Sequence, residues 1–239
     1  MNPARQLRIW RALVDRAGVR PPGISEVCAV AITLVGVDAA GVTLTLGRTP
    51  REPLYATGPL AGELEELALT LGEGPTVDAT AGTVTLVGDL LTAEPLARWP
   101  LFAPAAATAG VRAVFALPMR IGAIHLGVLD LYRGRPGDLD RDQLADALAL
   151  ADTACALLLD AQERGPAYPG EHGPEVAGSQ HPEVHQATGM ITVQLGVTAA
   201  VALIRLRAYA YSHERRLRDV AADVVARRIR FEVDDQNAS

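Results

Sequence analysis

The sequence predicts an α+β protein in which an antiparallel sheet flanked by helices is followed by a separate all-α bundle of three helices. Three observations predict this fold: two pairs of β-rich runs joined by turn residues, a stretch rich in Pro and Gly after residue 164, and three segments with helical spacing beyond it. The chain has 239 residues, of which 49% are hydrophobic and 21% charged. It is therefore long enough for two domains and too apolar to be disordered throughout.

The chain divides at a segment in which neither strand nor helical periodicity survives. This segment begins at Gly165-Pro166 and continues to His181-Pro182. At about 18 residues it is long for a loop inside a compact domain, so we interpret it as a linker. The predicted divisions are a sheet-containing domain at 1–163, a linker at 164–182, a three-helix domain at 183–231 and a tail at 232–239.

Two hairpins define the predicted sheet. The first joins the runs 27–35 and 42–46 through the turn residues 38–41, and the second joins 112–118 to 123–132. Both pairs are rich in the β-branched and apolar residues that half-buried strands favour. The remaining elements expected in this segment are helices at 4–17, 60–70 and 139–162 and a short strand at 83–87.

The first helix is predicted to be amphipathic. Its apolar residues gather on one side at helical spacing. They are Leu7, Trp10, Ala12, Leu13 and Val14.

Charge is distributed unevenly along the chain. All 22 basic residues are arginine, and the formal net charge is −6. Residues 1–164 carry 14 Arg against 19 Asp and Glu, whereas residues 184–231 carry eight Arg against three acidic residues. A local basic excess in an acidic protein indicates a contact surface for a polyanion.

Several classes of protein are disfavoured by composition. No window of 18 uncharged apolar residues is present, which argues against a membrane span. Arg8, Arg11 and Asp15 follow soon after the N-terminal residues, so no signal-peptide core is expected. Cys28 and Cys155 lie in apolar runs without partner spacing, so we expect buried, unreactive thiols and no disulfide. These features predict a cytoplasmic protein without a membrane partner.

The sequence offers no motif for catalysis, and neither a metal nor a cofactor is predicted. His181 and His185 stand four residues apart but lack a third ligand, and His125 lies in a predicted strand without a nucleophile motif nearby. The glycine-rich run at 72–75 lacks the Lys-Ser/Thr of a P-loop. Four aspartates lie at the start of a predicted helix, where the helix dipole stabilises negative charge, so we interpret them as structural. They are Asp138, Asp140, Asp142 and Asp146. The protein is therefore expected not to be an enzyme.

Three blocks of the second segment resemble the ANTAR domain, a three-helix RNA-binding module of transcription antitermination regulators. The blocks are Gln186–Ile191, Leu203–Ala210 and Leu217–Val225. The resemblance implies binding of short tandem hairpins in nascent leader RNA, usually by a dimer. One difference is Val201, where members often carry Glu. The capping box with Thr198 is then lost, which weakens that helix start by about 0.5–1 kcal/mol.

Eight residues are predicted to bind RNA. Gln186 and Thr188 offer hydrogen bonds to unpaired bases, and Gly189 permits close approach of the backbone. Arginines supply phosphate contacts, and they are Arg205, Arg207, Arg215, Arg216 and Arg218. Arg205 and Arg207 lie about 200° apart on a helix, so they cannot both face one partner, and the resemblance favours Arg207 and Arg215.

The first segment resembles the GAF domain that often precedes ANTAR in regulators of the actinobacterial type. The residues that carry the resemblance are Leu69–Ala79 and Gly127–Tyr132. GAF is a broad small-molecule sensor fold, so the ligand is unknown. Two alternatives remain equal. In one, a ligand pocket lies between the sheet and residues 90–110; in the other, the domain has a filled pocket and serves only dimerisation.

Together these features predict a GAF–ANTAR regulator that binds leader RNA and prevents terminator formation, as a homodimer. The long apolar helix at 139–162 and the small size of the bundle favour a dimer. One alternative is a small-molecule-sensing GAF regulator whose C-terminal helices form a protein-interaction module. Another is a DNA-binding factor, which the absence of a recognisable helix-turn-helix disfavours.

Overall fold

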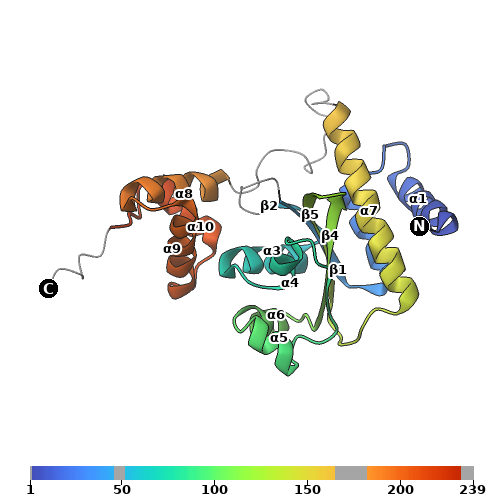
Figure 1. The fold of residues 1–239 in the computed structure, drawn as a ribbon, viewed down its shortest axis with the longest axis horizontal. Coiled ribbons are helices and arrows are strands. Elements are labelled where there is room, and N and C mark those ends of the chain that lie inside the picture. The colour runs from blue at the N-terminus through green and yellow to red at the C-terminus, as the bar shows by residue number, and fades with distance from the viewer. Residues whose placement is uncertain (1, 46–51, 165–181, 233–239) are drawn as a thin grey trace. The chain divides into compact units, whose positions relative to one another are not determined.

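The computed structural model of the chain describes residues 2–45, 52–164 and 182–232 (Figure 1). The chain forms two compact units. The N-terminal unit comprises Met1–Ala68 with Glu73–Gly178, and the C-terminal unit comprises Leu69–Gly72 with Ser179–Ser239. The predicted linker residues 165–181 and tail residues 233–239 lie outside the described residues.

The N-terminal unit is built on a five-stranded antiparallel sheet with the strand order β2-β1-β5-β4-β3. The strands are β1 (Ala39–Leu44), β2 (Glu52–Ala56), β3 (Thr85–Val87), β4 (Ala113–Ile121) and β5 (Ile124–Arg133). The hairpin predicted near residue 120 is present, because Ile121 pairs with Ile124 across a tight turn. Gly122 occupies this turn with φ 59°, a left-handed conformation that glycine adopts at little cost.

Helices cover both faces of the sheet (Figure 1). On one side lie α1 (Pro3–Ala17), α2 (Ile24–Ala31), the π-helix η1 (Ile32–Gly36) and α7 (Arg141–Arg164). On the other lie α3 (Pro59–Leu71), α4 (Pro75–Ala79), α5 (Ala93–Arg98) and α6 (Phe102–Thr108). The main core forms under α7 and α2, where Leu129 and Leu131 of β5 meet Phe115 and Leu117 of β4.

The first predicted hairpin is wrong, because the run 27–35 is helical. Gly23 N–H donates to Glu26 Oε2 at 2.9 Å, which caps α2. Residues buried at helical spacing are Ile24, Val27, Cys28, Ala31 and Val35. This segment is apolar nearly all round, so it lacked the alternation between faces that distinguishes a surface helix from a strand. β1 pairs instead with β5 and with β2, an edge strand that we did not predict.

Of the apolar residues that gather on one side of the first predicted helix, α1 fully buries only Leu13. Ile9, Leu13 and Ala17 are buried at a spacing of four, whereas Leu7, Trp10 and Val14 are 50%, 46% and 41% exposed. The helix is held to α7 by ion pairs that the apolar pattern did not reveal: Arg5 and Arg8 both reach Asp146, and Arg5 also reaches Asp142.

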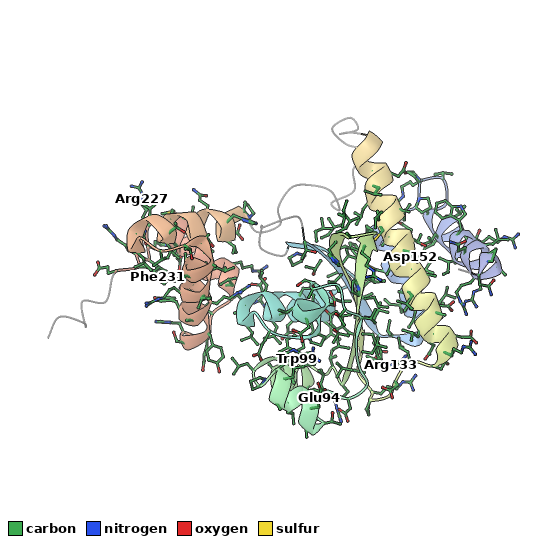
Figure 2. The ribbon with its side chains drawn as sticks, viewed as in Figure 1. Glu94, Trp99, Arg133, Asp152, Arg227 and Phe231 are labelled. Atoms are coloured by element: carbon green, nitrogen blue, oxygen red, sulfur yellow. The ribbon has the colours of Figure 1, made fainter. Side chains whose placement is uncertain are left out.

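Arg133, at the end of β5, satisfies the last carbonyls of η1 (Figure 2). Its Nε donates to Gly36 O at 3.0 Å and its Nη2 to Val35 O at 3.2 Å. The guanidinium also lies over the Phe115 ring, 5.3 Å from the centroid. Burial and then the charge of Arg135 lower the pKa of Arg133 from its ordinary value.

A buried polar network lies between the sheet and α3. Tyr132 Oη donates to Glu65 Oε1 at 2.8 Å, and the Thr43 hydroxyl donates to Glu65 Oε2. Gly41 makes room for this carboxylate, because a Cβ there would lie 2.6 Å from Glu65 Oε1. Burial first, and then Glu65 and Asp130, raise the pKa of Tyr132 well above its ordinary value.

The C-terminal unit contains the three predicted helices, α8 (Pro182–Leu195), α9 (Ala199–Ser212) and α10 (Leu217–Val225). Thr198 caps α9 as predicted, because its hydroxyl accepts a hydrogen bond from Val201 N–H at 3.4 Å. The core is formed mainly by small apolar side chains at helical spacing: Val184, Ala187, Ile191, Ala202, Leu206, Ala210, Leu217, Val220, Ala221 and Val224. These small side chains allow the three helices to pack closely.

Candidate nucleic-acid interface

The three RNA-binding residues predicted on α8 do not share one surface. Gln186 and Gly189 are exposed, and a Cβ added to Gly189 would meet no atom within 4 Å. Thr188 is buried, and its hydroxyl donates to Val184 O at 2.7 Å. Because this hydroxyl bonds within its own helix, we remove Thr188 from the candidate interface.

Asp223 of α10 holds two of the basic residues of the C-terminal unit. Arg215 Nη2 donates to Asp223 Oδ2 at 2.6 Å, and Arg228 Nη2 lies 2.5 Å from Asp223 Oδ1. These hydrogen bonds, from Arg215 first and then from Arg228, hold the pKa of Asp223 below its ordinary value. The two arginines are therefore engaged in holding the chain that enters and leaves α10.

The remaining predicted arginines differ in what they contact. Arg218 lies near Asp219, 3.7 Å away, and Arg207 is half-buried on α9. Arg205 and Arg216 are exposed, and in the part of the chain that the structure describes neither forms an ion pair. These two guanidinium groups are thus available to phosphate oxygens without first leaving a carboxylate.

Two further arginines, which we had not included among the predicted site residues, are also exposed. Arg227 (Figure 2) follows the end of α10 with φ 58°, and Arg230 lies three residues later in the chain. No carboxylate among the described residues pairs with either side chain. Their sequence signal is the Arg-rich run at 227–230, which follows the end of α10 at Val225.

An aromatic cluster lies at the C-terminal end of α9. Tyr209 and His213 stack with ring centroids 3.9 Å apart, and Phe231 meets Tyr209 edge-on at 5.5 Å. Phe231 N–H also donates to Gln194 Oε1 at 3.0 Å, which joins the C-terminal segment to α8. This packing keeps residues 227–230 close to the three helices.

In the N-terminal unit, a groove of about 390 Å³ lies between β3, α5 and the turn before α7. Its walls include Asp89, Glu94 and Asp138. Asp89 is paired with Arg112 at 2.8 Å. The groove borders the 90–110 region, where a pocket was one of the two alternatives, but its lining does not by itself define a ligand.

The sequence predicts neither metal-binding groups nor membrane-spanning helices, and the described residues bear on both predictions. Within the described ranges, no group of three or more His, Cys, Asp or Glu side chains could hold a metal ion. His181 lies outside those ranges, and His185 is partly exposed on α8. No single helix among the described residues is long and apolar enough to cross a membrane, although α8 and α9, bent by 106°, meet that criterion as a pair.

Comparison with known proteins assigns the C-terminal helices to a family. Residues 176–225 match the ANTAR domain. This match includes α8, α9 and α10. It also includes Asp223 and all five arginines predicted to bind RNA, which are Arg205, Arg207, Arg215, Arg216 and Arg218. Comparison with curated protein sequences found no match.

The N-terminal unit is similar to GAF domains of known structure. A GAF domain from a phosphoenolpyruvate-protein phosphotransferase of Coxiella burnetii has a TM-score of 0.52 and 16% identity, and the alignment covers 69% of this chain and 99% of that one. The corresponding Acinetobacter GAF domain has a TM-score of 0.49 and 14% identity over 70% and 99% of the two chains. The chain therefore combines a GAF fold with an ANTAR domain, an organisation that supports a role in regulation.

Proposed function

We propose that this protein is a transcription antitermination regulator that binds hairpins in nascent leader RNA and prevents formation of a terminator. The observation that carries the proposal is the ANTAR match at 176–225, which coincides with the basic part of an otherwise acidic chain. In this proposal the protein acts by binding and not as an enzyme. The GAF domain senses a small molecule or holds the dimer.

The cations of the C-terminal unit divide into two groups with different roles. Arg215 and Arg228 stabilise the fold through Asp223. Arg205 and Arg216 are exposed, and each contributes a phosphate contact with the release of counterions. This division revises the preference for Arg207 and Arg215 over Arg205, because removal of Arg215 would perturb folding as well as binding.

We further propose that the protein is a homodimer whose subunits meet through α1 and α7. Leu7, Trp10 and Val14 form an exposed apolar stripe on α1. On α7, Leu148 is 40% exposed and Asp152 lies on the same side one turn later (Figure 2). An apolar stripe of this kind is typical of a contact between helices, and a two-fold axis would bring both copies of the stripe together.

RNA binding is tested with the full chain and a pool of transcripts that carry two tandem stem-loops with randomised loop nucleotides. We expect enrichment of particular loops, and binding that weakens as salt rises. Arg205→Ala and Arg216→Ala should each reduce the slope of log affinity against log salt by about one unit. Arg120→Ala, which removes an exposed cation from the N-terminal unit, is the matched control.

The same experiment separates this proposal from its alternatives. Equal competition by duplex DNA would favour a DNA-binding factor, and failure of any RNA loop to be enriched would favour a protein-interaction module. A selected RNA is then placed before a terminator in a purified transcription reaction. Increased read-through on addition of the protein is the expected result, and unchanged read-through contradicts the antitermination role.

A further inference from the structure

One face of α9 is exposed and largely apolar, although the core of the three-helix bundle is already filled by other side chains. Ile204 is 61% exposed, Tyr211 is 54% exposed and Val201 is 39% exposed, and Ala208 lies between them. We call these four residues the α9 face. The opposite side of the helix is buried in the bundle through Ala202, Leu206 and Ala210. The α9 face is therefore not needed for packing within this unit.

Arginines border the α9 face on both sides, and α9 carries no Asp or Glu. At about 100° per residue, Arg205 and Arg207 lie about 160° apart when measured across this face. If two copies of the face met about a two-fold axis, the Arg205 side chain of each copy would enter the contact, and α9 carries no acidic residue to neutralise it. The charge therefore favours a polyanion over a second copy of the chain.

Tyr211 differs from its neighbour Tyr209 in what surrounds its ring. Tyr209 is stacked on His213 and meets Phe231, so its ring belongs to the aromatic cluster. Among the described residues, no aromatic ring packs against Tyr211. Tyr211 thus presents an aromatic ring next to apolar side chains, with Arg205 on the same exposed half of the helix.

We propose that the α9 face is the surface on which unpaired bases of an RNA hairpin loop stack, with the Tyr211 ring as the stacking partner and Arg205 contacting an adjacent phosphate. The proposal rests on the RNA-binding function proposed above and names the part of the RNA that is recognised. Bases have flat apolar faces, and sequence-specific recognition of RNA uses unstacked loop bases that pack on aromatic side chains. Ile204 and Val201 exclude water from the stacked base.

The test uses the full chain and the stem-loop RNA enriched by the wild-type protein. Tyr211→Ala and Tyr211→Leu should each weaken binding at least about tenfold, since both lack an aromatic ring. Tyr211→Phe should bind like the wild type because the ring, not the hydroxyl, makes the contact. Val193→Ala on α8, which truncates an 83% exposed apolar residue, is the matched control and should not change affinity. Thermal melts confirm that every variant is folded.

Each outcome decides between the proposals. If no RNA is enriched, both the RNA-binding function and this inference fail. If RNA is enriched but Tyr211→Ala binds it as tightly as the wild type, the function stands and the α9 face is not the stacking surface. If Tyr211→Leu retains affinity while Tyr211→Ala loses it, or if Tyr211→Ala changes the mass in light scattering, the face is an apolar protein contact and the inference is overturned.

Discussion

Arg215 and Asp223 lie eight residues apart in the chain, and their side chains meet at 2.6 Å across the turn that leads into α10. Asp223 is shared with Arg228, so one carboxylate joins the residues before α10 to those after it. This arrangement explains why part of the Arg-rich sequence belongs to the fold. It also makes the stability of the C-terminal unit dependent on pH.

We expect Asp223→Asn to lower the melting temperature of the C-terminal unit at pH 7. The folded-state pKa of Asp223 is lowered by Arg215 and Arg228, so its contribution is present above the unfolded-state pKa and is lost as pH falls through the folded-state value. The difference in melting temperature between the wild type and the variant should therefore shrink at acid pH. Circular dichroism melts between pH 7 and pH 3 measure it, and a difference that stays constant would contradict the assigned role.

Asp146→Ala should detach α1 from α7. The Asp146 side chain is 5% exposed and forms ion pairs with both Arg5 and Arg8. Its removal therefore leaves two guanidinium groups without their buried partner. We expect a loss of about 3 kcal/mol in the free energy of unfolding. Urea denaturation of the purified chain gives this value. Asp15→Ala, an exposed carboxylate on α1 itself, should change it by less than about 0.5 kcal/mol.

Trp10→Ala should weaken the homodimer. Trp10 is 46% exposed at the centre of the α1 stripe, where a large aromatic side chain contributes most to a protein contact. Light scattering over a range of micromolar concentrations should show a dimer for the wild type and a shift toward monomer for the variant. A wild-type monomer at all concentrations would exclude the dimer, and a variant that remains dimeric would move the interface elsewhere.

Tyr132→Phe should destabilise the N-terminal unit by about 1–3 kcal/mol, because it removes the hydroxyl that donates to the buried Glu65 carboxylate. Tyr211→Phe is the control, since that hydroxyl is on an exposed side chain. Tyr132 should also remain protonated in the native protein well above the pH at which an exposed tyrosine ionises. Ultraviolet titration should detect its ionisation only on unfolding.

The two cysteines should not react in the native state. Cys28 and Cys155 are buried, as expected from their apolar surroundings in the sequence, and burial followed by the charge of Asp152 raises the pKa of Cys155 to about 11. At pH 8 the thiol is therefore almost entirely neutral. A chromogenic disulfide reagent should label neither cysteine within minutes in buffer and both in denaturant. Rapid labelling of the native protein would contradict this.

The helices that could be predicted from the sequence are those whose packing leaves one side in water. In α7 and the three C-terminal helices, apolar residues recur at helical spacing. The β4–β5 hairpin was recognisable instead from two apolar runs that flank the turn at residues 120–122, although both strands are largely buried. The segment 24–36 could not be assigned in this way, because it is covered on most sides and is rich in β-branched residues. Its start at Gly23 is specified by the Glu26 side chain, a local signal that apolar periodicity does not contain.

The candidate interface was predictable in composition but not in detail. The excess of arginine located the basic region, and the family resemblance located its three helices. Which guanidinium groups are paired depends on Asp223, which lies five residues before Arg228 but eight after Arg215. The burial of Thr188 follows from the packing of α8 against its neighbours, and the exposure of Tyr211 emerges only when the two sides of α9 are compared in three dimensions.

The π-helix η1 fixes the number of residues allowed between α2 and the sheet. A π-turn accommodates one residue more than an α-turn, and here it brings the carbonyls of Val35 and Gly36 to Arg133. A deletion of one residue would rotate the end of the helix by about 100° and turn the side chains of β1 to opposite faces of the sheet. A residue with a Cβ would then stand where Gly41 passes Glu65. We therefore expect single-residue insertions and deletions at 32–36 to be as disruptive as core substitutions, even though Thr33 and Gly36 are exposed at the surface.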